Sequence, residues 1–228
     1  MRLGRYERNG ISVSASDQEE LAKKKVCVIG CGGLGGFIAE MLLRVGVLQL
    51  TLIDPDVFDE TNLNRQLFST EEGIGKPKVI EAKKRLLSVD KNAEIRTLQE
   101  KLDDTNAHEL LAGHDAVVDA LDNLVARRLA ASACRELGIP FVHGAIGGWY
   151  GQISVIMPHG GQTFEDLYNN ISDDNIDKSM GNLPFVAGYA ACIQCGETVK
   201  LLLGKEPNLQ GSVLRFDLLD TELEIFGF

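Results

Sequence analysis

The chain has 228 residues, of which 25% are charged and 44% hydrophobic, and its formal net charge is −10. This length suits one α/β domain with additions, and the composition is that of a globular protein with a sizeable core. The acidic balance argues against non-specific nucleic-acid binding, which needs a broad basic surface. No apolar run reaches the ~20 residues that cross a bilayer, and residues 1–10 lack the apolar segment of a secretory signal. We therefore expect a cytoplasmic protein that does not engage a membrane.

The apolar pattern alternates between short buried strands and amphipathic helices. Residues 1–20 are polar and predict an arm or a short helix. Strands are predicted at residues 26–29, 50–53, 93–98, 116–119, 140–144, 152–157, 213–218 and 222–226. Helices are predicted at residues 37–45, 78–89, 106–112, 124–137 and 184–203. This order predicts a doubly wound, mainly parallel, Rossmann-like α/β sheet, followed by a C-terminal helix and short closing strands.

A glycine-rich turn separates the first predicted strand from the first predicted helix. Its glycines are Gly30, Gly32, Gly33 and Gly35. This spacing lets the backbone approach a phosphate group at the start of a helix. Asp54 ends the second strand, where a carboxylate can accept hydrogen bonds from ribose hydroxyls. The alternative for the glycine run is a tight strand–helix turn that binds no ligand. The alternative for Asp54 is a turn residue before Pro55. NAD, FAD and ATP all use such turns.

A basic loop follows the second strand. Arg65 can fork onto phosphate oxygens, and Lys78 can add a point charge. Asn62 could fix a phosphate oxygen or the ribose. The positive charge of a lysine at the start of a helix interacts unfavourably with the helix dipole. A bound anion would explain this placement of Lys78. The alternative is a lysine side chain that is simply solvated.

Asp122 and Asn123 follow the predicted strand 116–119, at the edge where such sheets bind ligands. Asp122 could hold magnesium, which prefers hard oxygen ligands, or it could cap the next helix. With the glycine turn and the basic loop, this acid describes a site for a nucleoside polyphosphate and a metal ion. A dehydrogenase needs no such cations, and its one candidate proton donor, His143, has a structural role as the more ordinary explanation.

These motifs, in this order, resemble the ThiF/MoeB/HesA family, the bacterial relatives of ubiquitin-activating enzymes. The matching stretches are residues 5–8, 30–35, 54, 62–66, 75–78 and 122–123. The resemblance implies a homodimer of doubly wound domains that uses ATP and magnesium. It also implies adenylation of the terminal glycine of a small ubiquitin-like sulfur carrier with a Gly-Gly tail, with release of pyrophosphate.

The resemblance also implies roles for individual residues. Asp54 would hold the ribose, while Asn62, Arg65 and Lys78 would surround the triphosphate beside the glycine turn. Asp122, followed by Asn123, would hold magnesium. Arg8 would reach into the neighbouring subunit's site as an arginine finger. The expected catalytic residues are therefore Arg8, Arg65, Lys78 and Asp122.

The chain departs from the family pattern in its cysteines and beside Arg8. An odd count argues for free thiols: Cys27, Cys31, Cys134, Cys192 and Cys195. Cys192 and Cys195 lie in a predicted helix, and a lone pair cannot complete a four-ligand zinc site. We therefore expect buried thiols and no zinc. The crossover segment has no cysteine, which puts thioester or persulfide chemistry in doubt. Asn9 stands where the family usually has glutamine.

We expect one domain over residues 1–228. A nucleotide-binding core would span residues 25–157, and residues 158–183 would form a mobile crossover loop rich in Asn and Asp. Residues 184–228 would add the C-terminal helix and strands. Trp149 could line a groove for the carrier tail, or it could fill the core. The rival functions are a NAD-dependent oxidoreductase, a tRNA threonylcarbamoyladenosine dehydratase-like enzyme and a non-catalytic binding module.

Overall fold

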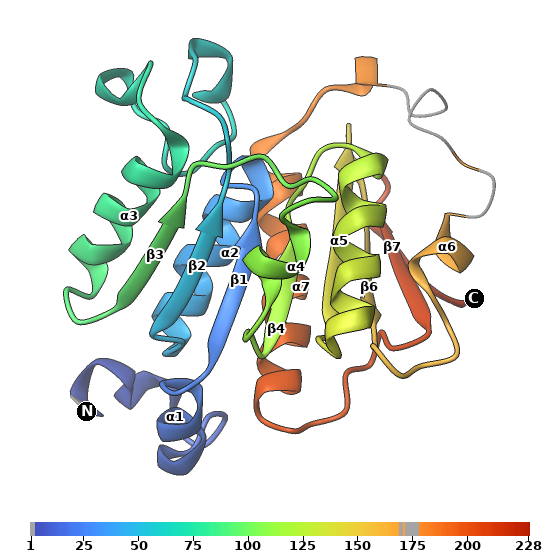
Figure 1. The fold of residues 1–228 in the computed structure, drawn as a ribbon, viewed down its shortest axis with the longest axis horizontal. Helices are drawn as coiled ribbons and strands as arrows, with labels where there is room; N and C mark the ends of the chain where they lie inside the picture. Colours follow the sequence, from blue (N-terminus) through green and yellow to red (C-terminus); the bar gives the residue numbers. More distant parts are fainter. Residues whose placement is uncertain (1–2, 169–170, 172–177) are drawn as a thin grey trace.

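The computed structural model describes residues 3–168, 171 and 178–228. Within this part of the chain, eight strands form one sheet in the order β3-β2-β1-β4-β5-β6-β7-β8 (Figure 1). The parallel strands are β1 (Lys25–Ile29), β2 (Gln49–Ile53), β3 (Glu94–Leu98), β4 (Ala116–Asp119) and β5 (Phe141–Gly147). The antiparallel strands are β6 (Tyr150–Ile156), β7 (Ser212–Asp217) and β8 (Glu222–Gly227).

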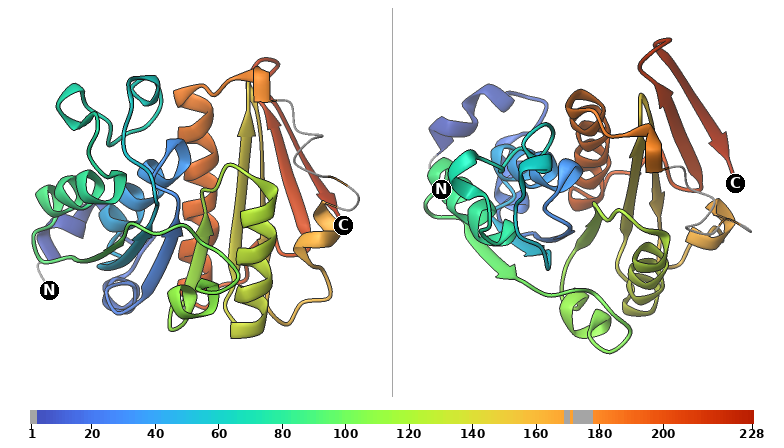
Figure 2. Two further views of the ribbon diagram at one scale, coloured as in Figure 1. Left: turned by 45° about the horizontal axis from the view of Figure 1, so that its top comes forward. Right: turned by 90° about the horizontal axis from the view of Figure 1, so that it is seen from above.

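Helices cover both faces of this sheet, as the views in Figures 1 and 2 show. One face packs against α2 (Gly33–Val45), α3 (Lys78–Val89) and α7 (Pro184–Leu202). The opposite face packs against α4 (Ala107–Leu111), α5 (Leu124–Leu137) and α6 (Phe164–Leu167). Alternate residues of β1 enter the two cores: Val26 and Val28 face α2, whereas Cys27 and Ile29 face α5. A strand buried on both faces needs this unbroken apolar run.

Short elements complete the described chain. They are η1 (Leu3–Asn9), α1 (Ala15–Leu21), η2 (Glu60–Asn62), η3 (Glu71–Gly73) and η5 (Lys178–Met180). The helix ends follow local chemistry. Gly46 and Gly138 end α2 and α5 with positive φ angles of 115° and 73°, which glycine adopts without a Cβ clash. Pro184 opens α7 at the first turn, where a missing N–H costs nothing.

The predicted fold class is confirmed, and the predicted strands and longer helices are all present. The apolar helical spacing starts at Phe37, but α2 itself begins at Gly33, so the glycine turn supplies the first helical residues. The crossover segment 158–183 contains α6 and η5, and its mobility stays a prediction. Its Asn169, Asn170 and residues 172–177 lie outside the described part of the chain.

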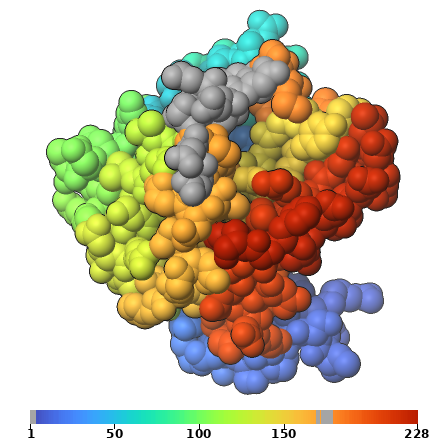
Figure 3. Space-filling model, turned by 90° about the vertical axis from the view of Figure 1, so that its right-hand side faces the viewer, coloured from blue at the N-terminus to red at the C-terminus, as the bar shows by residue number. Residues whose placement is uncertain are grey.

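The C-terminal hairpin forms the far edge of the sheet. In Figure 3 the residues of β7 and β8, in red, lie along the surface of the face shown. Leu223 and Ile225 of β8 are exposed to 51% and 60%. No helix among the described residues is long and apolar enough to span a bilayer.

Candidate functional site

The glycine turn lies where the order of the strands reverses. The chain runs from β1 outward to β2 and returns later to β4 on the other side of β1, which is the topological switch point where open α/β sheets bind ligands. The backbone is packed tightly there. A Cβ atom on Gly35 would lie 1.8 Å from the carbonyl oxygen of Gly30, and one on Gly30 would lie 2.5 Å from that of Ala120. Gly30 and Gly35 are therefore sterically required. The turn that contains them places the start of α2 at the carboxyl ends of the strands.

Asp54 directly follows β2 and contacts the glycine turn. Its side chain is buried, at 5% exposed. Its Oδ2 accepts a hydrogen bond from the backbone N–H of Cys31 at 2.6 Å, and Oδ1 accepts one from that of Asp56 at 2.8 Å. Burial raises the pKa of Asp54, while the two N–H donors and the nearby Lys78 charge oppose that rise. A carboxylate has about four acceptor sites, so capacity remains for ligand hydroxyls.

Arg65 and Gln66 approach the same turn from the basic loop. A Cβ atom on Gly33 would lie 3.8 Å from Cγ of Arg65, and one on Gly32 would lie 3.6 Å from Nε2 of Gln66. Arg65 donates to the carbonyl of Thr61 at 2.9 Å and forms no ion pair with the described residues. Gln66 was not among the predicted site residues, although it belongs to the loop motif. Its Oε1 is buried without a hydrogen-bond partner among the described residues, which fits an absent ligand because buried polar atoms are normally satisfied.

Lys78 is buried at the start of α3, at 7% exposed. Its Nζ pairs with Oδ2 of Asp56 at 3.0 Å. Asp56 also donates its backbone N–H to Asp54, so Lys78 lies next to the acid that contacts the glycine turn. The charge of Lys78 opposes the burial-driven rise in the pKa values of both Cys31 and Asp54. The alternative interpretation, that Lys78 is a solvated surface lysine, is wrong because the side chain is buried.

Asn62 lies in the same loop, but its amide is engaged locally. Oδ1 accepts from the backbone N–H of Asp59 at 3.2 Å, and Nδ2 donates to Oδ1 of Asp59 at 3.1 Å. The first of these bonds belongs to the capping box of η2, whose N-cap is Asp59. Asn62 therefore shapes the basic loop through its own side chain, and its contact with the triphosphate stays a prediction.

Asp122 follows β4, at the same edge of the sheet. The N-cap of α5 is Asn123, whose Oδ1 accepts from the backbone N–H of Ala126 at 2.9 Å. Asn123 also donates through Nδ2 to Oδ1 of Asp122 at 3.1 Å. The cap position that the sequence offered to Asp122 is thus filled by its neighbour, and the Asp122 side chain is exposed.

Arg8 lies at the opposite edge of the sheet. Its element, η1, is anchored near the ends of α2 and α3. Arg5 pairs with Asp90 after α3, and Asn9 donates to Gln18 of α1, which in turn donates to the carbonyl of Val45 in α2. Figure 1 places η1 below the sheet, while the carboxyl ends of β1 and β2 point upward. Within one chain, Arg8 does not join the other predicted residues.

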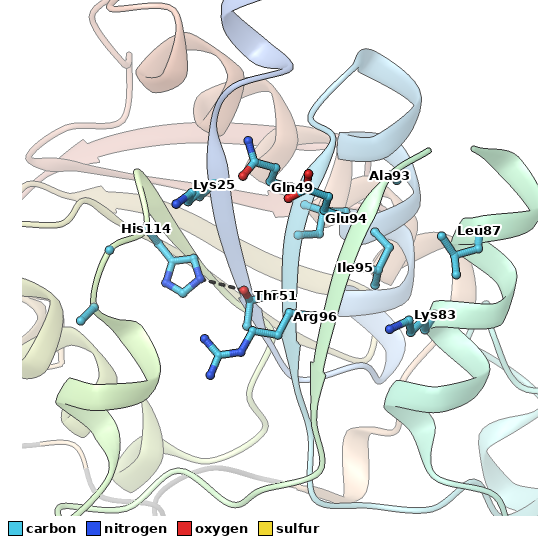
Figure 4. A pocket seen from close by; sticks show the side chains of 13 residues that line it. Lys25, Gln49, Thr51, Lys83, Leu87, Ala93, Glu94, Ile95, Arg96 and His114 are labelled. Carbon is cyan, nitrogen blue, oxygen red and sulfur yellow. Dashed lines mark hydrogen bonds between the residues drawn. The ribbon is translucent and has the colours of Figure 1, made fainter. Parts of the chain in front are cut away.

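A separate cavity of about 650 Å³ opens beside β1–β3 and is lined by the amino ends of these strands (Figure 4). It contains three cationic side chains, Lys25, Lys83 and Arg96. In Figure 4, Arg96 points to the His114 side of β3, whereas Lys83 lies on the other side. These cations do not converge, so this cavity does not offer a polyphosphate site.

Cys192 is exposed on one face of α7, whereas Cys195 is buried. The prediction that both members of this pair are buried thiols was therefore wrong for Cys192. Trp149 is 38% exposed, and its ring lies 5.1 Å from that of Phe185. It is therefore not a core residue.

Among the described residues, no group of three or more His, Cys, Asp or Glu could hold a metal ion. The expectation of no zinc stays a prediction.

Comparison with known proteins decides the family. The ThiF family profile matches residues 6–227. The chain belongs to the ThiF family. It is 35% identical to the SAMP-activating enzyme E1 of Haloferax volcanii, with 98% of this chain and 84% of that protein aligned. It is 34% identical to a sulfur carrier protein adenylyltransferase of Thermus thermophilus, with 96% and 84% aligned. This ThiF protein is thus an E1-like adenylyltransferase.

Other relatives are longer than this ThiF protein. It is 36% identical to the adenylyltransferase and sulfurtransferase MOCS3 of Arabidopsis thaliana, but it spans 49% of that protein's length. The crystal structure of E. coli MccB with ATP has a similar fold, with a TM-score of 0.86 and 21% identity over 98% of this chain and 71% of that one. This likeness establishes the fold alone.

Proposed function

We propose that this ThiF protein adenylates the C-terminal carboxylate of a small ubiquitin-like sulfur carrier with a Gly-Gly tail. The proposal rests on one arrangement: a buried acid, Asp54, and two cations, Arg65 and Lys78, border the glycine turn at the switch point. Relatives at 34–35% identity bear the names of a SAMP-activating enzyme and a sulfur carrier protein adenylyltransferase, which favours a carrier protein as the substrate.

ATP fits this arrangement. Asp54 can accept further hydrogen bonds from the ribose hydroxyls. The backbone N–H groups at the start of α2 can donate to phosphate oxygens. The buried Oε1 of Gln66, which has no hydrogen-bond partner among the described residues, can accept a hydrogen bond from the ligand. Magnesium fits as well, because it is usually held by one or two carboxylates together with substrate phosphates. Asp122, an exposed carboxylate at this edge, would hold it. When bound, the ion would neutralise phosphate charge.

The reaction needs no general base. The carrier's carboxylate is ionised at pH 7. One of its oxygens attacks the α-phosphorus, the bond from that phosphorus to the bridging oxygen breaks, and pyrophosphate leaves with the electron pair. The protein's contribution is to align the reactants and to oppose the charge that grows on the phosphates. Arg65 and Lys78 suit that task, and no nucleophilic cysteine is required.

The dimer remains part of the proposal. Arg8 is remote from the glycine turn of its own chain, so it can contribute only from a second copy. The carrier tail would lie beside Trp149 and Gly148, where Gly148 pairs with Asn182 of the crossover segment, and Trp149 would supply an apolar contact.

Exchange of labelled pyrophosphate into ATP, with candidate Gly-Gly-ended carriers, tests this function. The wild type should exchange, whereas Arg65→Ala and Asp122→Ala should lose about 100- to 1,000-fold in rate. The control is Arg215→Ala, which removes an exposed cation from β7, outside the site. Exchange by both site variants at the wild-type rate would refute the site. Tight NAD binding without exchange would favour an oxidoreductase instead.

A further inference from the structure

A buried series of hydrogen bonds joins the crossover segment to the sheet. Asp119 ends β4, His143 lies in β5, and Tyr168 follows α6; the first two are 0% exposed and Tyr168 is 7% exposed. Nδ1 of His143 lies 2.6 Å from Oδ2 of Asp119, and Nε2 lies 2.9 Å from the hydroxyl of Tyr168. Gln152 of β6 donates through Nε2 to the same hydroxyl. Neither the predicted site nor the proposed reaction uses these residues.

The donors and acceptors of this series can be assigned. Because Gln152 donates to the Tyr168 oxygen, the single hydroxyl proton of Tyr168 is free to point at His143. Nε2 of His143 is then an acceptor, so the ring proton sits on Nδ1 and donates to Asp119. Burial lowers the pKa of His143, against the opposing effect of Asp119. The imidazole is therefore neutral and fixed in one tautomer.

The series ends at the turn that carries Asp122. The second oxygen of Asp119, Oδ1, accepts from the backbone N–H of Leu121 at 2.9 Å. Arg127 of α5 pairs with Oδ2 of Asp119 at 3.3 Å and donates to the carbonyl of Leu121. The backbone N–H of Leu121, the residue before Asp122, is thus held by Asp119, and its carbonyl is held by Arg127, which pairs with Asp119. His143 contacts Asp119 directly.

The hydroxyl of Tyr168 is not needed to dock its own segment. Arg128 of α5 donates to the main-chain carbonyls of Tyr168 and Ile171 at 3.1 and 2.8 Å. The Tyr168 ring packs against Phe164, with the centroids 4.8 Å apart. These contacts do not involve the hydroxyl, so replacement of tyrosine by phenylalanine removes only its hydrogen bonds to His143 and Gln152.

We propose that His143 and Tyr168 are positioning residues for Asp122, which they hold through Asp119 and the Leu121 backbone. The inference rests on the proposed function, because it concerns the carboxylate assigned there to magnesium. Neither residue touches the ligand. They act as partners that orient a metal-binding group from behind, a role whose loss typically weakens metal affinity 10- to 100-fold.

Tyr168→Phe tests the proposal, with Tyr189→Phe of α7 as a matched control whose ring packs edge-on against Phe216. Calorimetry of ATP binding at a series of magnesium concentrations should show that Tyr168→Phe raises the half-saturating magnesium concentration about 10-fold. ATP binding without magnesium should be unchanged, which loss of folding would not produce. Histidine ¹⁵N NMR should show a protonated Nδ1 in the wild type and a shifted Nε2 signal in Tyr168→Phe.

His143→Asn gives a second test should Tyr168→Phe not fold. Its amide can still donate to Asp119 but is too short to meet Tyr168, and it should show the same change in magnesium dependence. An unchanged magnesium dependence in these variants, or a protonated Nε2 in the wild type, would overturn the inference while leaving adenylation intact. A wild type that fails to exchange pyrophosphate with any carrier would instead remove the proposed function, and this inference with it.

Discussion

Oδ2 of Asp54 lies 2.6 Å from the backbone nitrogen of Cys31, so the acid that directly follows β2 holds the glycine turn that follows β1. The contact joins residues 23 positions apart in sequence. It gives Asp54 a structural role even without a ligand, because the buried N–H of Cys31 needs an acceptor. The turn and the acid therefore form one unit, and a change in either should alter both folding and nucleotide binding.

Asp54→Asn should change how stability depends on pH. Because burial raises the pKa of Asp54 in the folded chain, the folded state binds more protons than the unfolded state between the two pKa values. The wild-type free energy of unfolding should therefore lose a contribution as the pH rises from about 4 through the folded pKa. Urea unfolding of both proteins at each pH isolates this contribution, because other carboxylates cancel. A difference between the two proteins that does not vary with pH would contradict the expectation.

Lys78→Ala should slow adenylation, whereas Lys76→Ala should not. The two lysines are neighbours in sequence, but Lys78 is buried beside the glycine turn and Lys76 is exposed. We expect a loss of about 100- to 1,000-fold in pyrophosphate exchange for Lys78→Ala and little change for Lys76→Ala. Equal rates for the two variants would show that burial of Lys78 serves only its pairing with Asp56.

Gly35→Ala should disrupt the fold at the glycine turn. The added Cβ would lie 1.8 Å from the carbonyl oxygen of Gly30, a backbone atom that cannot move alone, and overpacking of this kind costs about 3 kcal/mol or more. Gly196→Ala in α7 is the matched control, because a Cβ there meets nothing within 4 Å. It should stabilise the helix by about 1 kcal/mol. Thermal unfolding of the three proteins measures both effects.

Arg8→Ala and Asp122→Ala should complement each other if Arg8 acts across a dimer. Each variant alone should be nearly inactive. After joint unfolding and refolding, a mixed dimer would hold one site with an intact Asp122 and an intact Arg8 from its partner. Because half of the dimers are mixed and each has one working site, about one quarter of wild-type activity should return. No recovery on mixing would place Arg8 outside the neighbouring site.

Cys192 should react with iodoacetamide in the folded protein far faster than the other four cysteines. It is exposed, whereas the others are buried. Burial raises the pKa of Cys134 to about 12 and raises those of Cys27, Cys31 and Cys195 as well, so little of the reactive thiolate forms. Mass spectrometry identifies the labelled site. Adenylation should survive the labelling, since Cys192 lies outside the site; its loss would implicate this thiol in the reaction.

The sequence alone determined the sheet, its flanking helices and the glycine turn. Strand runs such as Val26–Ile29 and helix stops such as Gly46 follow local rules, because apolar periodicity and turn chemistry depend on neighbouring residues. The motifs also pointed to Asp54, Arg65, Lys78 and Asp122, since parallel strands bring their carboxyl ends to one edge.

Only the tertiary structure decided which side chains are committed and which are available. Lys78 is buried and pairs with Asp56. The Asn62 side chain accepts a hydrogen bond in the cap of η2, and Cys192 is exposed. The tertiary structure also joined Asp119, His143 and Tyr168, which lie 24 and 25 positions apart along the chain. These outcomes depend on the directions in which distant elements pack, and no local pattern of residues carries that information.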